Sequence, residues 1–404
     1  MARLLWGQRQ DIGPSGRSGH AMTYDPVHKR TLLAGGLATE RTSFETWAWS
    51  GKYWTQIGRF GPSGRSGTTL SYDEDRQRVI LFGGSRTTDS AETSDTWALD
   101  GIDWTQVQDV GPTARRAHAT AYDSARGRLV LFGGLHEQDP DHPRQPLGDT
   151  WEWDGESWTQ VEETGPAPRG AHCMAYDSAR LRVVLFGGIS DQVTDVFDDT
   201  WEWDGTNWTK VADTGASPRA GAAMTSTGAT LILHGGSGPD EVALRDTWQW
   251  TAGEWTKLQE MGPSARIDHA MAFDRDRNRV VLFGGLAAPP LADTWEAPIT
   301  LPAGPDGQVT VTVNPPAVHT ADTAVLTVTL PGAQLVATVV VITVTAPGSA
   351  ARPVGQLEIP AGVISGNLRL DDLAAALSDL GVTAPVNLTF NTDRGGAATL
   401  RVLP

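Results

Sequence analysis

Apolar and polar positions alternate in a unit that recurs along the first three hundred residues. One copy, residues 165–210, reads GPAPRGAHCMAYDSARLRVVLFGG, followed by a short loop and DDTWEWDGTNWTK. Two apolar segments flank Tyr176-Asp177, and two tryptophan-containing segments flank Asp204-Gly205. An Asp-Gly pair between such segments favours a hairpin, because a type I′ turn needs positive φ at both central residues. Each copy therefore predicts four short antiparallel strands, called a, b, c and d in chain order.

Six copies of this unit follow one another. Strand b ends each time in a pair of glycines, whose first members are Gly35, Gly83, Gly133, Gly187, Gly235 and Gly284, at spacings of 48 to 54 residues. Strand c carries a tryptophan after a threonine, at Trp47, Trp97, Trp151, Trp201, Trp248 and Trp295. Four strands per unit at a period near fifty residues predict a β-propeller with six blades.

The two ends of the repeat region are incomplete in complementary ways. Trp6-Gly7-Gln8 matches Trp54-Thr55-Gln56 of a strand d, whereas the sixth copy ends after strand c at Trp295-Glu296. We therefore expect residues 3–10 to supply strand d of the sixth blade. That arrangement closes the ring and leaves no open sheet edge at the junction.

The pattern changes near residue 299, beyond which the chain has no tryptophan, tyrosine or lysine. We expect a propeller over residues 1–298, a linker over 299–307 and a second domain over 308–404. Strands are expected in the second domain at 308–314, 323–330, 335–346, 355–359, 367–370, 386–391 and 397–402, and a short helix at 371–380. Seven strands in about 100 residues are typical of an immunoglobulin-like (Ig-like) β-sandwich.

Composition excludes several classes of function. The formal net charge of −16 argues against nucleic-acid binding, which needs a positive surface. No stretch of about 20 apolar residues predicts a membrane-spanning helix, and the N-terminal apolar run is too short for a secretory signal. We expect a soluble protein of the cytoplasm or of a virion or surface assembly. The single cysteine, Cys173, excludes an intramolecular disulfide, and we expect a buried, inert thiol.

The glycine pair after an apolar residue, with tryptophans at fixed spacing, resembles the kelch repeat over roughly residues 1–298. The resemblance implies an all-β fold, namely a six-bladed kelch-type β-propeller closed by the N-terminal strand. The Ig-like sandwich would follow it. This resemblance specifies the fold well and says little about activity.

One arginine opens strand a of every blade and one acid opens every strand c. The arginines are Arg17, Arg65, Arg115, Arg169, Arg219 and Arg266, and the acids are Glu45, Asp95, Asp149, Asp199, Asp246 and Asp293. Both sets should gather where the b-to-c and d-to-a connections emerge, a surface that we call the loop face. The arginines could bind an acidic partner, as they do in some kelch propellers, because arginine forks suit carboxylates. Their regular recurrence favours the alternative that each one pairs with an acid of its own or the adjacent blade.

Four histidines, His20, His118, His172 and His269, each lie three residues after that arginine. Because they occupy equivalent positions in separate blades, we expect packing and hydrogen bonding to the neighbouring blade rather than a metal site. The fifth blade departs from the pattern, with Ala222 in place of histidine and His234 in place of phenylalanine. Sequence drift or a local contact would explain this departure.

The b-to-c loops vary while the strands do not, and we expect loops 85–94, 135–148 and 189–198 to dominate the loop face. The longest, 135–148, carries His136, Glu137, Asp139, Asp141 and His142. Variable loops on a rigid scaffold are where recognition is usually placed. Three prolines in this loop limit how metal ligands could converge, so we expect no metal and no cofactor.

We expect a non-enzymatic recognition protein whose loop face binds a protein or a glycan. Its C-terminal domain would dock it to a larger homo- or hetero-oligomeric assembly. The alternative is a kelch-type enzyme, a sugar epimerase or an oxidoreductase, with its site at the channel mouth. An unpaired arginine and an acid of raised pKa there would favour the enzyme. A third alternative is a purely structural assembly protein.

Overall fold

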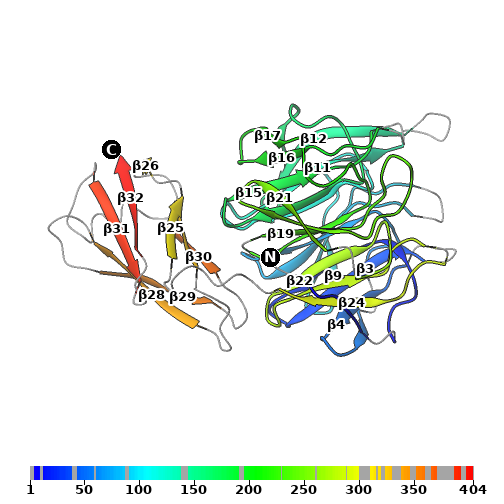
Figure 1. The fold of residues 1–404 in the computed structure, drawn as a ribbon, viewed down its shortest axis with the longest axis horizontal. Helices are drawn as coiled ribbons and strands as arrows, with labels where there is room; N and C mark the ends of the chain where they lie inside the picture. Colours follow the sequence, from blue (N-terminus) through cyan, green and yellow to red (C-terminus); the bar gives the residue numbers. More distant parts are fainter. Residues whose placement is uncertain are drawn as a thin grey trace. The chain divides into compact units, whose positions relative to one another are not determined.

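The computed structural model describes residues 4–9, 12–38, 43–58, 61–86, 91–137, 144–190, 195–228, 230–259, 262–287 and 289–299. Beyond residue 309 it describes the backbone of the strands β25 to β32. The chain divides into two compact units, and the division falls after Ile299 (Figure 1). Within the described residues, no helix has the length and apolar character needed to cross a lipid bilayer.

The first unit consists of six four-stranded antiparallel sheets, as the repeat predicts. Blade 1 contains β2 (Ser18–Asp25), β3 (Arg30–Leu37), β4 (Thr46–Trp49) and β5 (Trp54–Ile57), and blade 2 contains β6 (Thr69–Asp73), β7 (Arg78–Phe82), β8 (Thr96–Asp100) and β9 (Asp103–Gln108). Blade 3 contains β10 (Ala119–Asp123), β11 (Arg128–His136), β12 (Gln145–Trp153) and β13 (Trp158–Glu162), and blade 4 contains β14 (Cys173–Asp177), β15 (Arg182–Phe186), β16 (Thr200–Trp203) and β17 (Trp208–Ala212). Blade 5 contains β18 (Ala223–Ser226), β19 (Leu231–His234), β20 (Thr247–Thr251) and β21 (Glu254–Gln259).

Blade 6 combines the two ends of the repeat region. It contains β22 (Ala270–Asp274), β23 (Arg279–Phe283), β24 (Thr294–Pro298) and the N-terminal strand β1 (Gly7–Gln8). β1 pairs with β24 in the register Gly7 opposite Glu296 and Gln8 opposite Trp295 (Figure 1). The predicted closure by the N-terminal strand is therefore confirmed.

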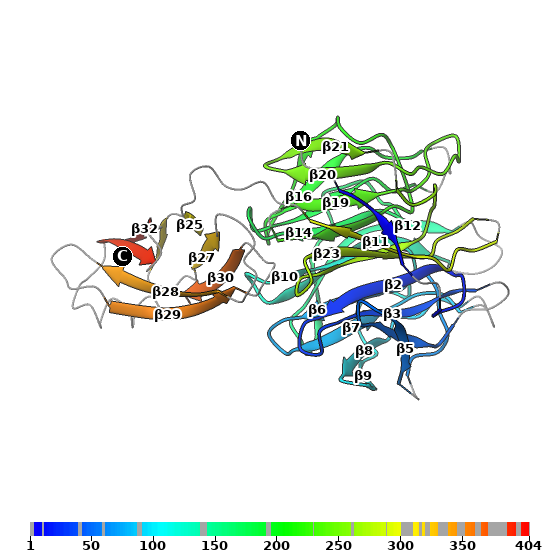
Figure 2. The same ribbon diagram turned by 60° about the horizontal axis from the view of Figure 1, so that its bottom comes forward.

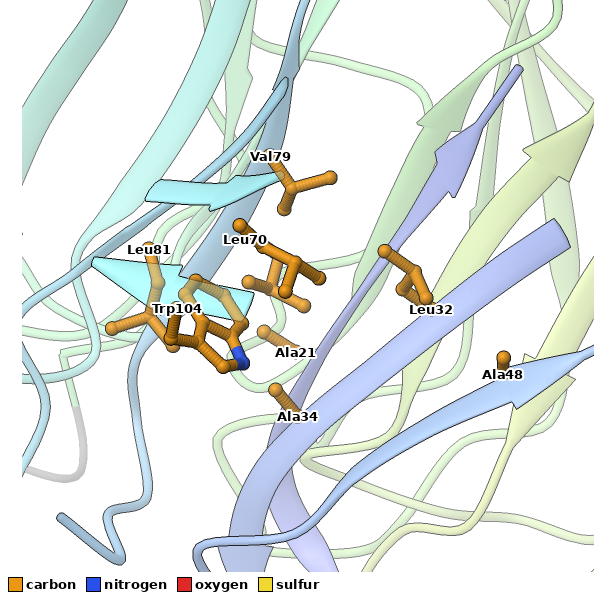
Figure 3. Packing of buried hydrophobic residues seen from close by; sticks show 9 residues of the cluster. Ala21, Leu32, Ala34, Ala48, Leu70, Val79, Leu81 and Trp104 are labelled. Carbon is orange, nitrogen blue, oxygen red and sulfur yellow. The ribbon is translucent and has the colours of Figure 1, made fainter. Parts of the chain in front are cut away.

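Each strand a lies beside strand a of the next blade, and β22 lies beside β2, so the ring is closed. Apolar side chains from adjacent sheets interlock between blades. Figure 3 shows one such layer, in which Leu32 and Ala34 of blade 1 meet Leu70, Leu81 and Trp104 of blade 2. The core is thus a series of layers between sheets, and no blade buries its apolar faces alone.

Tryptophans of strand d tie each blade to the preceding one. The Trp208 indole Nε1 donates a hydrogen bond to Thr150 Oγ1 at 2.8 Å, and equivalent bonds join Trp54 to Thr294 and Trp104 to Thr46. Trp6 makes the same bond to Thr247 Oγ1 at 3.3 Å. The N-terminal segment therefore repeats the side-chain contact of an ordinary strand d as well as its backbone pairing.

The second unit is also built of strands (Figure 2). β25 (Thr310–Asn314), β27 (Ala324–Thr329) and β30 (Ser365–Leu370) form a three-stranded sheet. β26 (Ala317–His319), β32 (Ala397–Leu403), β31 (Val386–Thr392), β28 (Thr338–Thr345) and β29 (Arg352–Ile359) form a five-stranded sheet in that order. All seven predicted strands occur with shifted ends, and β26 was not predicted. The helix expected at 371–380 lies outside the described residues.

Candidate binding face

The six repeated arginines are buried and paired on the loop face. Arg169 has no exposed surface, and its Nη1 and Nη2 atoms bond the two carboxylate oxygens of Asp199 at 2.6 and 3.0 Å. Its Nη1 also reaches Gly187 O at 2.9 Å, and its Nε reaches Ala167 O at 2.9 Å. The other pairs, with their shortest N–O distances, are Arg17–Glu45 (2.8 Å), Arg65–Asp95 (2.6 Å), Arg115–Asp149 (2.7 Å), Arg219–Asp246 (2.7 Å) and Arg266–Asp293 (2.8 Å). Each arginine thus joins three segments of its own blade.

This geometry bears on the prediction that the six arginines contact a partner. Their exposed fractions are 0–2%, and their donors are engaged within the blade. The six side chains lie where the alternative, pairing with an acid of the same blade, places them. They could contact a partner only if these pairs opened. A role for these six side chains in binding therefore stays a prediction, which the burial does not favour.

The acids of these pairs remain ionised well into the acidic range. Partial burial by itself would raise the pKa of Asp199, but the hydrogen bonds and charge of Arg169 outweigh it and hold that pKa below its usual value. The Trp201 indole adds a hydrogen bond to Asp199 Oδ2 at 2.7 Å. The pKa values of Glu45, Asp95, Asp149, Asp246 and Asp293 are lowered for the same reasons.

The glycine pairs allow the next blade to approach. A Cβ atom on Gly133 would lie 2.7 Å from the backbone oxygen of Arg169 in the following blade, and its φ is +60°. The second glycine, Gly134, donates its N–H to that same oxygen at 2.9 Å. The equivalent bond recurs at all six junctions, from Gly36, Gly84, Gly188, Gly236 and Gly285 to the arginine of the next blade. A side chain at the first glycine would therefore push two blades apart.

A closed ring of six backbone hydrogen bonds joins the blades near the loop face, around the axis of the propeller, which we call the channel. It runs through the residue two positions after each arginine, and we call Gly19, Gly67, Ala117, Ala171, Gly221 and Asp268 the channel ring. Each of the six N–H groups donates to the backbone oxygen of a neighbouring blade's member, at 2.8–2.9 Å. All six residues have positive φ, between 52° and 65°. The ring fixes the relative positions of the blades where a ligand would approach the channel.

The four repeated histidines pack against the preceding blade, as expected. The His20 ring meets Phe283 edge-on at 5.5 Å between centroids, and its Nε2 lies 3.1 Å from Phe283 O. Burial, aided by the charge of Arg17, lowers the pKa of His20 to about 3. His118 and His172 have equivalent ring contacts with Phe82 and Phe132. These histidines are neutral structural groups.

Blade 5 departs from the repeat at a position where its side chain makes the contacts that phenylalanine makes in other blades. His234, which replaces the phenylalanine, is buried, and its Nδ1 lies 2.9 Å from Thr247 Oγ1. Its ring also contacts His269 and Trp6, at 5.4 and 5.5 Å between centroids. The substitution therefore sits where the N-terminal segment completes blade 6.

The thiol of Cys173 is inert in this environment. The residue is buried, and loss of hydration raises the pKa of the thiol to about 12. A thiol with such a pKa is not a nucleophile at neutral pH.

One charged cluster on the loop face breaks the sixfold pattern. It joins Glu92 of blade 2 to Arg116, His136, Glu137 and Arg144 of blade 3. The buried Glu92 carboxylate accepts a hydrogen bond from Glu137 N at 2.9 Å and lies 3.1 Å from His136 Nδ1. Arg116 Nε lies 3.6 Å from Glu92 Oε1, and Arg144 Nε donates to Glu137 Oε2 at 3.0 Å.

A second break lies in the channel ring itself. Five of its members are glycine or alanine, and the sixth is Asp268, whose side chain is exposed. The surrounding protein limits hydration of this carboxyl and raises its pKa, while the charge of Arg116 opposes that effect. Blades 3 and 6 are three positions apart in a ring of six, so the two residues belong to opposite sides of the channel.

Exposed apolar residues also lie on the loop face. Leu37 and Phe44 flank the b-to-c loop of blade 1, and Leu286 lies in that of the neighbouring blade 6. Their exposed fractions are 38%, 70% and 43%, and Val110, between blades 2 and 3, and Val242 of blade 5 are exposed as well. Among the described residues, the loop face therefore has exposed apolar groups on blades 6 and 1 next to a charged cluster on blades 2 and 3.

The predicted loop residues are only partly within the described structure. His136 and Glu137 belong to the charged cluster, whereas Asp139, Asp141 and His142 lie outside the described residues. Sequence reasoning placed Arg144 in this loop but missed Glu92, Arg116 and Asp268. Alignment of the repeats contained a signal for two of them, since Arg116 and Asp268 replace small or uncharged residues at their positions. No group of side chains in the described ranges is arranged to hold a metal ion.

Comparisons with known proteins agree with this architecture. The model of the KLHDC2/KLHL20/DRC7 Kelch-repeats domain matches residues 77–285. A solved structure titled "Structure of YjhT" is similar to the chain, with a TM-score of 0.54, 16% identity, and coverage of 70% of this chain and 95% of the other. At that identity the likeness concerns the fold alone. No curated protein matches the chain significantly.

Proposed function

Because the chain belongs to the family of the KLHDC2/KLHL20/DRC7 Kelch-repeats domain, we propose that it is a non-enzymatic recognition protein that binds a partner through its loop face. One observation carries the proposal. The arginines that repeat in every blade are buried and paired with acids of the same blade, whereas Arg116, Asp268 and the cluster around Glu92, which break the repeat, lie on the loop face. Repeated contacts hold the scaffold together, and the asymmetric residues are left for specific recognition.

The character of the loop face favours a protein partner over a glycan. Exposed side chains such as Phe44 and Leu286 offer apolar contact area, and the cluster around Arg116 offers charged groups beside it. Protein interfaces commonly combine an apolar centre with polar groups at the rim. A neutral glycan would use the charged groups poorly.

We further propose that residues 308–404 form an Ig-like sandwich, with residues 299–307 as a linker. The support is the strand order. An Ig constant-type sandwich places its first, second, fourth and fifth strands in one sheet and its third, sixth and seventh in the other. β25, β27 and β30 match the first, second and fifth strands and β28, β31 and β32 match the second set, whereas β29, in the fourth place, pairs with β28. This domain would dock the propeller to a larger assembly, in the cytoplasm or at a virion or cell surface.

An enzyme with a site at the channel mouth remains the second candidate, because one specific observation favours it. Arg116 and Asp268 are an arginine and an acid of raised pKa at that mouth. Against it, Arg116 already lies beside the buried carboxylate of Glu92. We therefore rank recognition first.

The test compares the wild type with a variant in which residues 137–144 are replaced by two glycines. Both proteins are used to capture partners from a lysate of the host and to probe a glycan array. The proposal predicts that the variant loses a partner that the wild type captures. A control in which the c-to-d turn of blade 3, residues 154–157, is replaced by two glycines should retain it. Equal capture by all three proteins would contradict a role for this loop.

A further inference from the structure

The channel ring presents one carboxylate at the mouth of the channel. The ring is held by six backbone hydrogen bonds, so the position of Asp268 is set by all six blades. Its φ of 52° is one that aspartate adopts more readily than most residues. Five blades supply only glycine or alanine at this position, so no other side chain longer than a methyl group projects from the ring.

The carboxylate of Asp268 is available for a ligand. No hydrogen bond or ion pair joins it to any other residue within the described part of the chain, and its side chain is exposed. A Cβ atom on Gly221 of blade 5 would lie 2.7 Å from Asp268 Oδ1. The carboxylate thus extends over a neighbour that has no side chain, and it is not covered.

Charges elsewhere at the mouth nearly cancel. Arg116 and Arg144 carry two positive charges, and Glu92 and Glu137, which lie beside them, carry two negative charges. The charge of Asp268 is not balanced in this way. The net charge of −16 for the chain adds a field that attracts cations.

We propose that Asp268 binds the cationic side chain of a lysine or arginine that a partner protein inserts at the channel mouth. Leu286 belongs to the same blade as Asp268, and Phe44 to the adjacent blade 1, so a partner segment could place an apolar group on Leu286 and a cation at the ring. This inference rests on the proposed function and specifies the chemistry of the partner.

The raised pKa of Asp268 is consistent with this assignment. Reduced hydration disfavours the charged carboxylate at this exposed residue, the charge of Arg116 offsets that effect only in part, and a bound cation would stabilise the charged form further. Binding of a cation should therefore become weaker as pH falls through that raised pKa, because a protonated Asp268 offers no charge.

The experiment uses the acetylated and amidated peptide Gly-Lys-Gly as a probe, with Gly-Gln-Gly and Gly-Glu-Gly as comparisons. Binding to the full chain is measured by ligand-observed NMR for the wild type and for Asp268→Asn, since asparagine also tolerates the left-handed backbone. Asp240→Asn, which alters an exposed acid in the b-to-c loop of blade 5, is the matched control. Melting curves confirm that all three proteins are folded.

The proposal predicts that the lysine peptide binds the wild type and Asp240→Asn about tenfold more tightly than Asp268→Asn, the effect of losing one charge-assisted contact. Equal binding by the two variants would overturn it, as would a preference of the wild type for the glutamate or glutamine peptide. If replacement of residues 137–144 abolishes partner capture while the lysine peptide ignores Asp268, this inference fails and the proposed function stands. If the peptide result holds but no loop variant alters capture, the proposed function fails instead.

Discussion

A buried arginine in each blade is held by a carboxylate, a glycine carbonyl and the carbonyl of its own turn. Desolvation of a guanidinium is costly unless its donors are bonded, and here Arg169 has partners on all sides. The intact pair and the loss of one partner therefore change the free energy of unfolding by unequal amounts. The intact pair contributes modestly to stability, while removal of one partner leaves a charge that the site cannot hydrate.

The first prediction concerns this pair. Arg169→Met keeps the apolar part of the side chain and leaves Asp199 unpaired, so we expect a loss of about 3–5 kcal/mol in the free energy of unfolding. Arg144→Met, whose pair with Glu137 is exposed, should lose less than about 1 kcal/mol. Urea unfolding monitored by tryptophan fluorescence measures both. A small effect of Arg169→Met would show that the buried pairs are dispensable.

The second prediction concerns pH. Five buried histidines have lowered pKa values, to about 3 for His20, His172 and His234 and well below 6.5 for His118 and His269. The unfolded chain therefore binds more protons than the native one below about pH 6.5, and stability falls as pH falls. At pH 5 each histidine lowers the free energy of unfolding by at most about 2 kcal/mol. The five losses together approach the whole stability of a typical domain.

Acidic side chains also affect how stability depends on pH. The arginine-bound acids have lowered pKa values, so their contribution is lost only at still lower pH. Asp177, whose pKa burial raises to about 6, acts in the opposite sense, as does Asp268, whose pKa is also raised. We expect acid unfolding between about pH 6 and 4, checked by urea midpoints across that range. A midpoint that does not change from pH 7 to 5 would contradict the assignment of neutral buried histidines.

At the residue scale, the sequence predicts the repeated arginine–acid pairs better than it predicts the residues that depart from the repeat. The arginine and acid positions recur with the repeat, so their association follows from the register. The cluster around Glu92 requires contact between loops of two blades, and the position of Asp268 requires the channel ring. Both depend on how the blades meet, which single positions do not reveal.

Strand β1 is the element on which the closed ring depends. It is only two residues long by backbone pairing, yet Arg9 N adds a bond to Thr294 O at 2.7 Å and Arg9 Nε bonds the buried Glu296 at 2.9 Å. Trp6 contributes the inter-blade contact of a normal strand d. Side chains therefore supplement a short backbone pairing.

The third prediction is that deletion of residues 1–9 destabilises the whole first unit. The deletion exposes the edge of β24 and removes Trp6, and loss of a packed tryptophan alone costs about 3–5 kcal/mol. Deletion of residues 1–3 serves as the control and should leave stability unchanged. Calorimetry distinguishes the two. If the longer deletion melted like the full chain, closure by β1 would not matter for stability.

At the element scale, strand positions were predicted well because glycine pairs and Asp-Gly pairs mark their ends. The type I′ turn predicted at Asp204-Gly205 was wrong, because Trp203 pairs with Trp208 across a four-residue turn and only Gly205 of the pair has positive φ. The prediction missed β26, a three-residue strand that pairs in parallel with β32 at the far end of the domain. So short a segment has no periodicity of its own, and its pairing comes from a partner some eighty residues away. The helix expected at 371–380 stays a prediction.

The whole molecule combines a repeated framework with an asymmetric surface. Identical contacts close six blades into a ring, and identical contacts cannot select a partner by themselves. Selection therefore falls to Phe44, Leu286, Asp268 and the cluster around Arg116, all on the loop face. The c-to-d turns form the other face, where Tyr53 of blade 1 is also an exposed aromatic residue.

The most direct measurement compares Phe44→Ser with Tyr53→Ser, which remove aromatic side chains of similar exposure, 70% and 58%, from opposite faces of the same blade. The affinity of each variant for a partner captured by the wild type is measured by calorimetry, with melting curves to confirm equal folding. We predict that Phe44→Ser binds at least about tenfold more weakly, since truncation of a central aromatic contact commonly costs more than 1 kcal/mol. Tyr53→Ser should bind like the wild type. Full binding by Phe44→Ser together with loss in Tyr53→Ser would place recognition on the opposite face and contradict the account.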